Sequence, residues 1–530
     1  MAAGALLIAV AAISLMIVTS ILKKRFEPYI HDAAVRYLQE RFDSEVELGS
    51  LQIHMPQAST LRLLMTRGRG AVAQVEGSNL SLRHMGRRDI PPMFAIKHFQ
   101  FGVDLGVLLD KTKRVPVIEL EGMEIYVPPK GERPDLRSRS SQESSTPPPE
   151  QHSSGVLIEE VLIHNAVLVI LPRDESKIPL QFDIQSLRME SVGKESAMKY
   201  DAELTNPKPP GAIHSQGTFG PWVADKPSDT PLNGDYTFDK ADLGVFKGIA
   251  GILNSQGKFE GTLSRVMARG KATVPDFRLK SANNPVPLET VFEVVVDGTN
   301  GNTILSPVTA TLGSTHFTTS GAVIKREKYS RRTIALDVSM PKGEIRDLLR
   351  LATKGDPFME GQVSLKAKID IPPLSGKVRE KLVLEGVFGV SEGKFLKSNI
   401  QDQIDSLSRR GQGQPKNEAI DEVFANMDGA FKLDDEVIAF RSLFFAVPGA
   451  AVDLAGNYDL SGDQLDMHGS LRLQAKVSQT LTGWKRWALK PLDPLFAKNG
   501  AGTFLRIKID GTSHSPHFGL EKRSGQPVRK

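Results

Sequence analysis

Two segments of this 530-residue chain come close to a cofactor-binding pattern. The run from Gly251 to Phe259 (GILNSQGKF) is close to a phosphate-binding loop. However, its glycines lie one residue too far apart, and Phe259 stands where a Ser or Thr would bind magnesium. The run from Gly68 to Ala73 (GRGAVA) fits a loose dinucleotide-binding pattern, but no helical pattern follows it. The first run is therefore interpreted as a turn after a helix, and the second lies among predicted strands.

The residues that could act as bases, nucleophiles or metal ligands are not arranged for that chemistry. A Ser-Pro pair separates His514 from His517, and the proline breaks any helix that would present both imidazoles on one face. The pair Asp434-Asp435 follows a strand that ends at Leu433, where turn chemistry explains it. The sequence contains no GxSxG, HExxH or EF-hand motif and no cysteine. It therefore predicts no catalytic residues, no metal site and no cofactor, and it favours a binding or structural role.

The composition is that of a large folded protein with a mild basic charge. Hydrophobic residues make up 40% of the chain, aromatic residues only 6%, and the formal net charge is +5. The basic residues are dispersed, apart from Lys23 to Arg25 and the C-terminal tail. This dispersion gives little support to nucleic-acid binding, so no nucleic-acid partner is predicted.

The N-terminal segment predicts a membrane anchor. The run from Ala2 to Leu22 contains no charged residue, and as a helix it would span about 32 Å, which is enough to cross a bilayer. Nothing basic precedes this run and Lys23-Lys24-Arg25 ends it, so an uncleaved anchor is favoured over a signal peptide. The positive-inside tendency of that basic triplet would hold the body of the protein in the cytoplasm.

The spacing of apolar residues then changes from a helical period to a period of two. Phe26, Ile30, Ala34, Leu38 and Phe42 recur every four residues and predict a short amphipathic helix. Further along, apolar residues alternate with polar ones, which is typical of strands with one buried and one solvent-exposed face. In the central part of the chain, six such residues are predicted to share one apolar groove: Ile334, Leu336, Val338, Val363, Leu365 and Ile369. The alternate residues Lys366, Lys368 and Asp370 are predicted to face water.

Turn signals between the alternating runs predict a mostly antiparallel sheet. The dipeptides typical of tight hairpins are Asn233-Gly234, Asp297-Gly298, Asn300-Gly301, Asp428-Gly429 and Asp510-Gly511. The segment from Gly131 to Gly155 is rich in Ser, Pro, Gln and charge and predicts a disordered loop. Because similar apolar runs flank it, this loop is expected to be an excursion between two neighbouring strands.

Four C-terminal segments in a fixed order carry a family resemblance. They are Leu443 to Tyr458 (LFFAVPGAAVDLAGNY), Leu471 to Ser478 (LRLQAKVS), Pro491 to Phe496 (PLDPLF) and Gly502 to Phe518 (GTFLRIKIDGTSHSPHF). In this order the chain resembles the AsmA-like family of bacterial envelope proteins. The single anchor, the helix from Phe26 to Phe42 and the strands between Phe99 and Val127 fit the same family. The basic flank of the anchor and the insertion from Gly131 to Gly155 depart from it.

The resemblance implies a fold class and a division of the chain. Members of the family are similar to bridge-like lipid transfer proteins and are anchored in the inner membrane. The implied fold is mainly β: a single N-terminal transmembrane helix is followed by an elongated, curved, mostly antiparallel sheet that forms an apolar groove, with a few short helices. The expected parts are an anchor (1–25), an N-terminal helix and the start of the groove (26–130), the disordered loop (131–155), the central groove (156–420) and the AsmA-like C-terminal region (421–530).

The resemblance also implies a function and a location. It places the body in the periplasm, against the positive-inside tendency, as a single-pass protein of the bacterial inner membrane. Its expected partners are phospholipid acyl chains, the inner membrane, and outer-membrane or other envelope proteins. The expected function is to assist phospholipid transport to the outer membrane. Two alternatives stay open: a scaffold for outer-membrane protein assembly without lipid conduction, and an anchored envelope hydrolase whose residues meet only in space.

Overall fold

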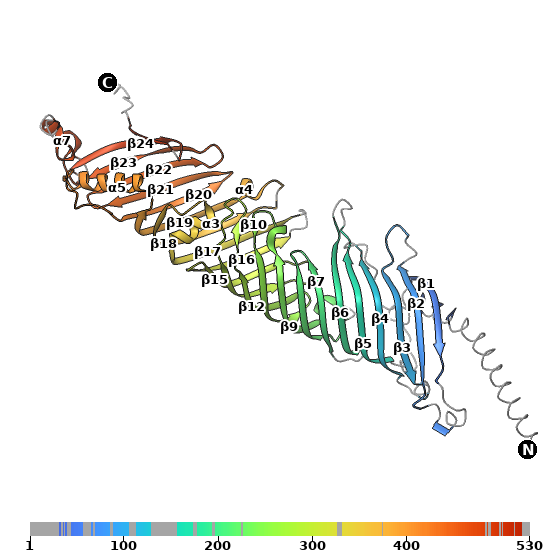
Figure 1. Ribbon diagram of the computed structural model, residues 1–530. Coiled ribbons are helices and arrows are strands. Elements are labelled where there is room, and N and C mark those ends of the chain that lie inside the picture. Colours follow the sequence, from blue (N-terminus) through green and yellow to red (C-terminus); the bar gives the residue numbers. More distant parts are fainter. Residues whose placement is uncertain are drawn as a thin grey trace, which may run out of the picture. The chain divides into compact units, whose positions relative to one another are not determined.

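The structure is a computed structural model (Figure 1). It describes residues 31–32, 35–36, 38–39, 44–56, 65–66, 69–84, 88–104, 106, 113–128, 156–172, 178–192, 197–223, 226–325, 331–373, 375–482, 485, 489–497, 500, 502–513 and 515–521. The predicted anchor from Ala2 to Leu22, most of the helix from Phe26 to Phe42 and the predicted loop from Gly131 to Gly155 lie outside these residues. Within them, no helix is long and apolar enough to cross a membrane.

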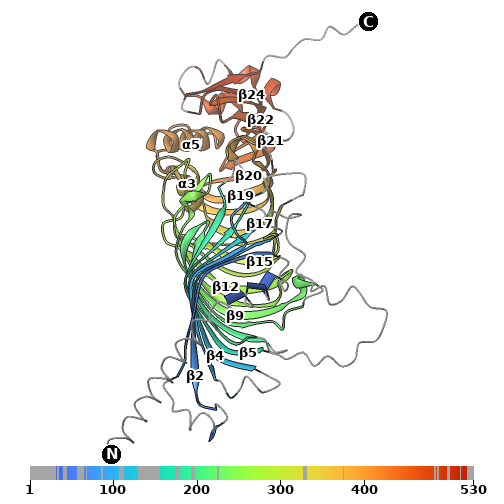
Figure 2. The same cartoon turned by 90° about the vertical axis from the view of Figure 1, so that its right-hand side faces the viewer.

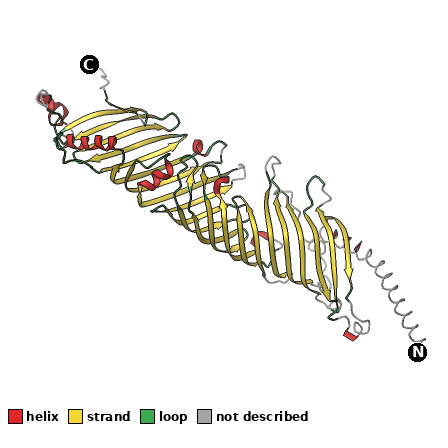
Figure 3. Cartoon of the chain, in the orientation of Figure 1, coloured by secondary structure: helices red, strands yellow, loops and turns green. Residues whose placement is uncertain are grey.

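Strands dominate the described residues, as Figure 3 shows, and this confirms the predicted mainly β class. Twenty-three described strands are assigned to one sheet, and two short strands form a second. Contacts divide the chain into two units. The first unit comprises residues 1–241 and 256–266, and the second comprises residues 242–255 and 267–530.

The first unit is built from long strands that pair with their neighbours in chain order. Its strands are β1 (Ser44–His54), β2 (Val72–His84), β3 (Phe94–Asp104), β4 (Lys113–Val127), β5 (Val156–Ile170), β6 (Leu180–Val192), β7 (Met198–Pro207), β8 (Pro210–Phe219) and β9 (Pro231–Asp242). Successive strands are antiparallel except β4 and β5, which pair side by side in parallel. The long segment between β4 and β5 thus connects neighbouring strands, as predicted. Two further strands, β11 (Ile252–Thr262) and β12 (Arg265–Val274), have residues in both units.

In the first unit, a row of residues, one on each of six strands, interrupts the regular alternation of side chains between the two faces of the sheet. Three members, Asn79, Gly122 and Asn165, have positive φ angles of 51°, 64° and 53°. On either side of Asn165, the odd-numbered Ile163 and the even-numbered Ala166 are buried in one hydrophobic cluster. The row therefore has the effect of a β-bulge. Odd-numbered residues before it and even-numbered residues after it point to the same face, so apolar side chains stay together. By register, the row comprises Gly49, Asn79, Lys97, Gly122, Asn165 and Gln185.

The second unit continues with antiparallel hairpins in chain order. Its strands are β14 (Leu288–Val296), β15 (Thr303–Leu312), β16 (Thr315–Lys325), β17 (Arg332–Glu344), β18 (Met359–Ile371), β19 (Val383–Phe395), β20 (Ala425–Asp434), β21 (Val437–Val447), β22 (Ala450–Asp459), β23 (Gln464–Leu473), β24 (Thr503–Gly511) and β25 (Pro516–Leu520). Each pairs with the next. The separate small sheet consists of β10 (Ile249–Ala250) and β13 (Arg278–Leu279).

Short helices interrupt the hairpins of the second unit. Among the described residues, the α-helices are α3 (Ile345–Ala352), α4 (Val378–Lys381), α5 (Ser398–Gly411) and α7 (Asp493–Phe496), and the 3-10 turns include η4 (Leu243–Val245) and η5 (Val477–Thr480). Helix α3 follows β17 and α5 follows β19, so both leave the sheet at the same end of its strands. Figure 2 shows them on one side of those strands.

The turn predictions are correct in the β14–β15 connection. There, Asp297-Gly298 and Asn300-Gly301 form a tight turn in which the Gly301 N–H donates to the Asp297 carbonyl at 2.6 Å. Gly301 has a positive φ of 73°, which explains why glycine is favoured there. Asp510-Gly511 closes β24, and Gly511 likewise has a positive φ of 96°.

Two of the turn predictions are wrong, because Asn233-Gly234 lies inside β9 and Asp428-Gly429 lies inside β20. At both glycines an aromatic side chain from a nearby strand occupies the space of the missing side chain. A Cβ on Gly429 would lie 2.9 Å from the Phe388 ring, and one on Gly234 would lie 2.6 Å from the Tyr200 hydroxyl. Here glycine serves close packing rather than a turn.

Candidate functional site

All six residues predicted to share a groove lie on one face of β17 and β18. Leu336 lies opposite Ile369, and Val338 lies opposite Ala367. Leu365 lies opposite Met340, and after a bulge Val363 lies opposite Gly343. Directly opposed residues of an antiparallel pair point to the same face, and residues two apart on one strand do so as well. Ile334, two residues before Leu336, therefore completes the set.

The same face continues across the neighbouring strands as an apolar surface. Val323 of β16 lies opposite Ile334, and Leu384 of β19 lies opposite Ile369. Further along, Phe431 of β20 lies opposite Phe440 of β21. Successive strands bring Leu454 and Leu471 onto this face in the same way. We call this surface, from β16 to β23, the apolar face of the second unit.

One end of the apolar face is closed by helices. Beneath α3, Met359 is 1% exposed and Val363 is 5% exposed, and both belong to a cluster against which Ile345 and Leu348 of the helix pack. Beneath α5, Ile404 packs in a second cluster with residues of β20 to β23. Val363, one of the six predicted groove residues, is therefore part of a closed core. Leu365 packs against the same core.

Carboxylates on the helices fix this cover to the sheet. On α3, Asp347 accepts hydrogen bonds from the Ser314 N–H at 2.9 Å and from the Thr315 hydroxyl at 2.8 Å. On α5, the buried Asp405 accepts hydrogen bonds from the Val423 N–H at 2.9 Å and from the Gln401 amide at 2.8 Å. Charge-assisted hydrogen bonds of this kind are stronger than neutral ones, so each helix is held in one position.

The other end of the apolar face lacks such a cover. Ile334, Leu336, Val338 and Ile369 are each half-buried by their neighbours in the sheet. In the described part of the chain, the extensive contacts of β16 to β23 are with adjacent strands and short helices. We call this half of the apolar face the open half. It can accept an apolar ligand from above the sheet.

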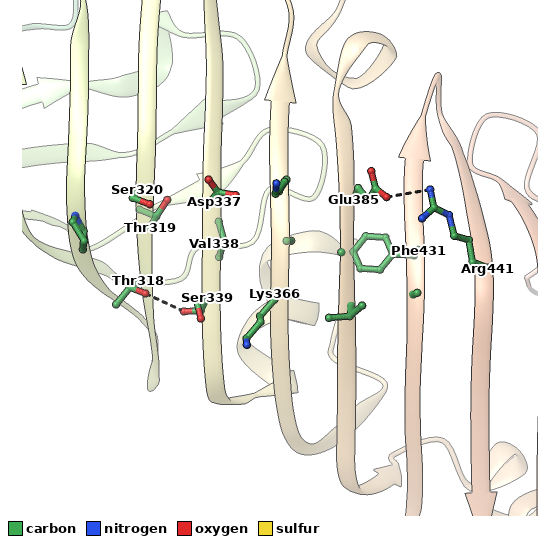
Figure 4. A pocket seen from close by; sticks show the side chains of 16 residues that line it. Thr318, Thr319, Ser320, Asp337, Val338, Ser339, Lys366, Glu385, Phe431 and Arg441 are labelled. Atoms are coloured by element: carbon green, nitrogen blue, oxygen red, sulfur yellow. Dashed lines mark hydrogen bonds and ion pairs between the residues drawn. The ribbon is translucent and has the colours of Figure 1, made fainter.

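The opposite face of β17 and β18 is mostly polar. Lys366, Lys368 and Asp370 are exposed there, which confirms their predicted position. A hollow of about 590 Å³ is lined by Asp337, Lys366 and Glu385 and also by Val338 and Phe431. Figure 4 shows these side chains. An exposed ion pair at 3.1 Å joins Arg441 to Glu385 at the border of the hollow. The lining of the hollow thus combines charged residues of the polar face with residues that the register assigns to the apolar face.

The described residues contain no group of three or more His, Cys, Asp or Glu side chains that could hold a metal ion. Comparisons of the chain with protein-family models, with curated proteins and with solved structures found no match. The open half of the apolar face is therefore a candidate site that rests on this chain's own geometry.

Sequence reasoning missed the aromatic part of the face. Phe388, Phe431 and Phe440 join the apolar face from β19 to β21. The signal was present, because Leu384, Gly386, Phe388 and Val390 alternate with Glu385 and other residues of the opposite face. A search for period-two runs that accepts glycine as an apolar position would have found them.

Proposed function

We propose that the protein binds lipid acyl chains on the open half of the apolar face and so assists phospholipid transport. In this proposal it is a single-pass protein of the bacterial inner membrane whose body lies in the periplasm. The resemblance of its sequence to the AsmA-like family supports this location and direction of transport. The anchor would be the charge-free run from Ala2 to Leu22, and the finer fold would be an elongated, curved groove.

The single observation that carries the proposal is the uncovered apolar surface. Contiguous apolar patches of more than a few hundred Å² are rare on soluble monomers and mark binding sites or aggregation hazards. Acyl chains suit this surface because they are unbranched, need no hydrogen-bond partners and gain about 0.8 kcal/mol for each methylene buried. Leu336 and Ile369 supply an aliphatic floor for them, while Lys366, Lys368 and Asp370 lie on the opposite face.

The scaffold alternative has one observation in its favour. The clusters beneath α3 and α5 show that part of the same face is a closed core that needs no ligand. A scaffold would carry such cores and no lipid, whereas a lipid-binding protein requires that the open half be occupied. Lipid content therefore separates the two functions.

The test is lipid extraction from the purified full-length protein followed by mass spectrometry. We expect phospholipid in at least a one-to-one ratio to protein after detergent washing. A folded protein that carries no lipid, and takes none up from phospholipid vesicles, would overturn the proposal and favour the scaffold.

A matched pair of variants locates the bound lipid. Leu336→Asp places a carboxylate on the open half, where it can stay hydrated at the cost of acyl binding, so we expect most lipid to be lost with a small change in melting temperature. Lys366→Asp changes the opposite face and should retain lipid. Equal lipid loss in both variants would contradict binding at the open half.

A further inference from the structure

In the first unit, the face that carries the buried apolar cluster of β5 also carries a pair of hydroxyl groups. Tyr200 of β7 lies opposite Met189 of β6, which packs against that cluster. Tyr200 is half-buried on this face, whereas Lys199 and Asp201 are exposed on the opposite one. We call the face of Tyr200 the apolar face of the first unit.

Two glycines leave room for the tyrosine ring. Gly217 of β8 lies opposite Tyr200, and Gly234 of β9 lies opposite Gly217, so neither strand places a side chain beside the ring. A Cβ on Gly234 would lie 2.6 Å from the Tyr200 hydroxyl. The ring therefore reaches across β8 to the position of Gly234.

The hydrogen bonds of the pair fix which atoms donate. Ser215 of β8 donates its one hydroxyl proton to the Asp235 carbonyl at 3.0 Å. The hydroxyl oxygens of Tyr200 and Ser215 are 3.1 Å apart, so Tyr200 must be the donor in the bond between them. Both protons are then used, and the Tyr200 oxygen can accept a further hydrogen bond but cannot donate one.

Packing against glycine does not by itself require this hydroxyl. In the second unit Phe388 lies opposite Gly429, and its ring occupies the space beside that glycine without any polar atom. A hydroxyl that leaves water costs free energy unless its hydrogen-bonding capacity is used. The acceptor on Tyr200 therefore favours a ligand that brings a donor to the apolar face.

Apolar side chains border the hydroxyl pair on both sides along the strands. The opposed pairs are Leu204 with Ile213 on one side and Phe219 with Leu232 on the other. Across the strands, the border is Met189 in one direction and Phe259 in the other, since a Cβ on Gly234 would lie 3.0 Å from the Phe259 ring. A donor that reaches Tyr200 is therefore expected within an apolar chain rather than at its end.

We propose that Tyr200 and Ser215 form a recognition site for an acyl chain that carries a hydroxyl group part-way along its length. The inference rests on the proposed function, because it places acyl chains on the apolar face of the first unit as well, and it adds a substrate class. The ligand hydroxyl donates to the Tyr200 oxygen while its methylenes contact the bordering apolar side chains. An unsubstituted chain leaves that oxygen unpaired, and a keto chain places a second acceptor against it.

The site is tested by competition among stearic, hydroxystearic and ketostearic acids that carry the substituent at the same mid-chain carbon. Displacement of a fluorescent fatty acid from the full-length protein reports binding. The reference protein carries Leu336→Asp, which in our proposal removes acyl binding at the open half. It should bind hydroxystearic acid at least as tightly as stearic acid, and ketostearic acid more weakly than either.

Tyr200→Phe in the reference protein keeps the ring beside the glycines and removes the acceptor. It should weaken binding of hydroxystearic acid about three- to tenfold, as expected for one hydrogen bond, and leave stearic acid unchanged. The control is Tyr126→Phe. Tyr126 lies three residues after Met123 of the β5 cluster, so it points to the opposite face, where its hydroxyl donates to Glu124 at 3.1 Å. The control should keep the affinity for hydroxystearic acid.

Ser215→Ala tests the assigned direction of the hydrogen bond. Without the serine oxygen, the Tyr200 proton can bind a ligand acceptor, so ketostearic acid should bind several-fold more tightly than it does to the reference protein. Hydroxystearic acid should keep its affinity. An unchanged affinity for ketostearic acid overturns the recognition site.

The other outcomes separate the two levels of the argument. The same ratio of hydroxystearic to stearic affinity in the reference protein and in Tyr200→Phe overturns the recognition site and leaves acyl binding intact. So does fatty acid binding that is present in the unsubstituted protein and absent from the reference protein. Binding of none of the three acids by the unsubstituted protein overturns the proposed function itself.

Discussion

The two halves of the apolar face in the second unit have similar side chains but different surroundings. In the half beneath α3, Met359 and Val363 are almost completely buried in a cluster closed by helix residues. In the open half, Leu336 and Ile369 pair across the same two strands and stay half-buried. The strands run through both halves, so the strand pattern alone does not decide which becomes core.

The difference lies in the short helices, which cover one half of this face and leave the other half open. Helix α3 is placed by Asp347, and α5 is placed by Asp405. Where such a helix lies, methyl and methylene groups gain a second layer of contacts, and in our proposal acyl chains supply that layer where no helix lies. The covered half should therefore determine stability, and the open half should determine lipid content.

The largest expected effect is on stability in the covered half. Met359→Ala removes a side chain that is 1% exposed, so it should lower the free energy of unfolding by about 2–5 kcal/mol, as other large-to-small core changes do. Denaturant unfolding measures this directly. Lipid bound per folded molecule should not change.

The control for this variant is Leu336→Ala in the open half. Its side chain is only half-buried, so we expect a loss of about 1 kcal/mol, together with reduced lipid binding. If both variants lost similar stability and the same share of lipid, the division into two halves would be wrong.

A smaller effect is expected from the carboxylate that holds α5. Asp405→Ala leaves the buried N–H of Val423 without its acceptor, which should cost about 1–3 kcal/mol. Asp405→Asn keeps one acceptor oxygen and should cost less. Hydrogen exchange at residues 398–411 should rise in the alanine variant while exchange in β17 and β18 stays slow. Uniform loosening of the whole unit would show that α5 is not a local cover.

The alternation of residues along the strands could be predicted from the sequence, but the helices that cover part of the sheet could not. Period-two alternation placed Leu336 and Ile369 on one face and Lys366 on the other, because each strand residue has only two directions available. The interior glycine of Asp428-Gly429 was misread as a turn, since the Phe388 ring that occupies its space comes from another strand. Such cross-strand neighbours leave no local signal.

Helix α5 and a contact between Gly248 and Val378 show a second limit of what the sequence predicts. On α5, Gln401, Asp405 and Ser408 are buried beside Ile404, so half of its inner face is polar and the apolar period is weak. The contact between Gly248 and Val378 joins positions that are far apart in the chain and carry no common motif. Both features depend on long-range packing and become visible only in three dimensions.

The most direct test of lipid binding by the open half is site-specific photocross-linking in cells. A photoreactive phenylalanine analogue is introduced at Leu336 or Ile369, and at Lys366 or Lys368 on the opposite face of the same strands. After illumination, mass spectrometry of the purified protein should find phospholipid attached at the first two positions and none at the second two. Equal labelling of both faces, or no lipid at Leu336 and Ile369 in the folded protein, would contradict the proposal that the open half binds acyl chains.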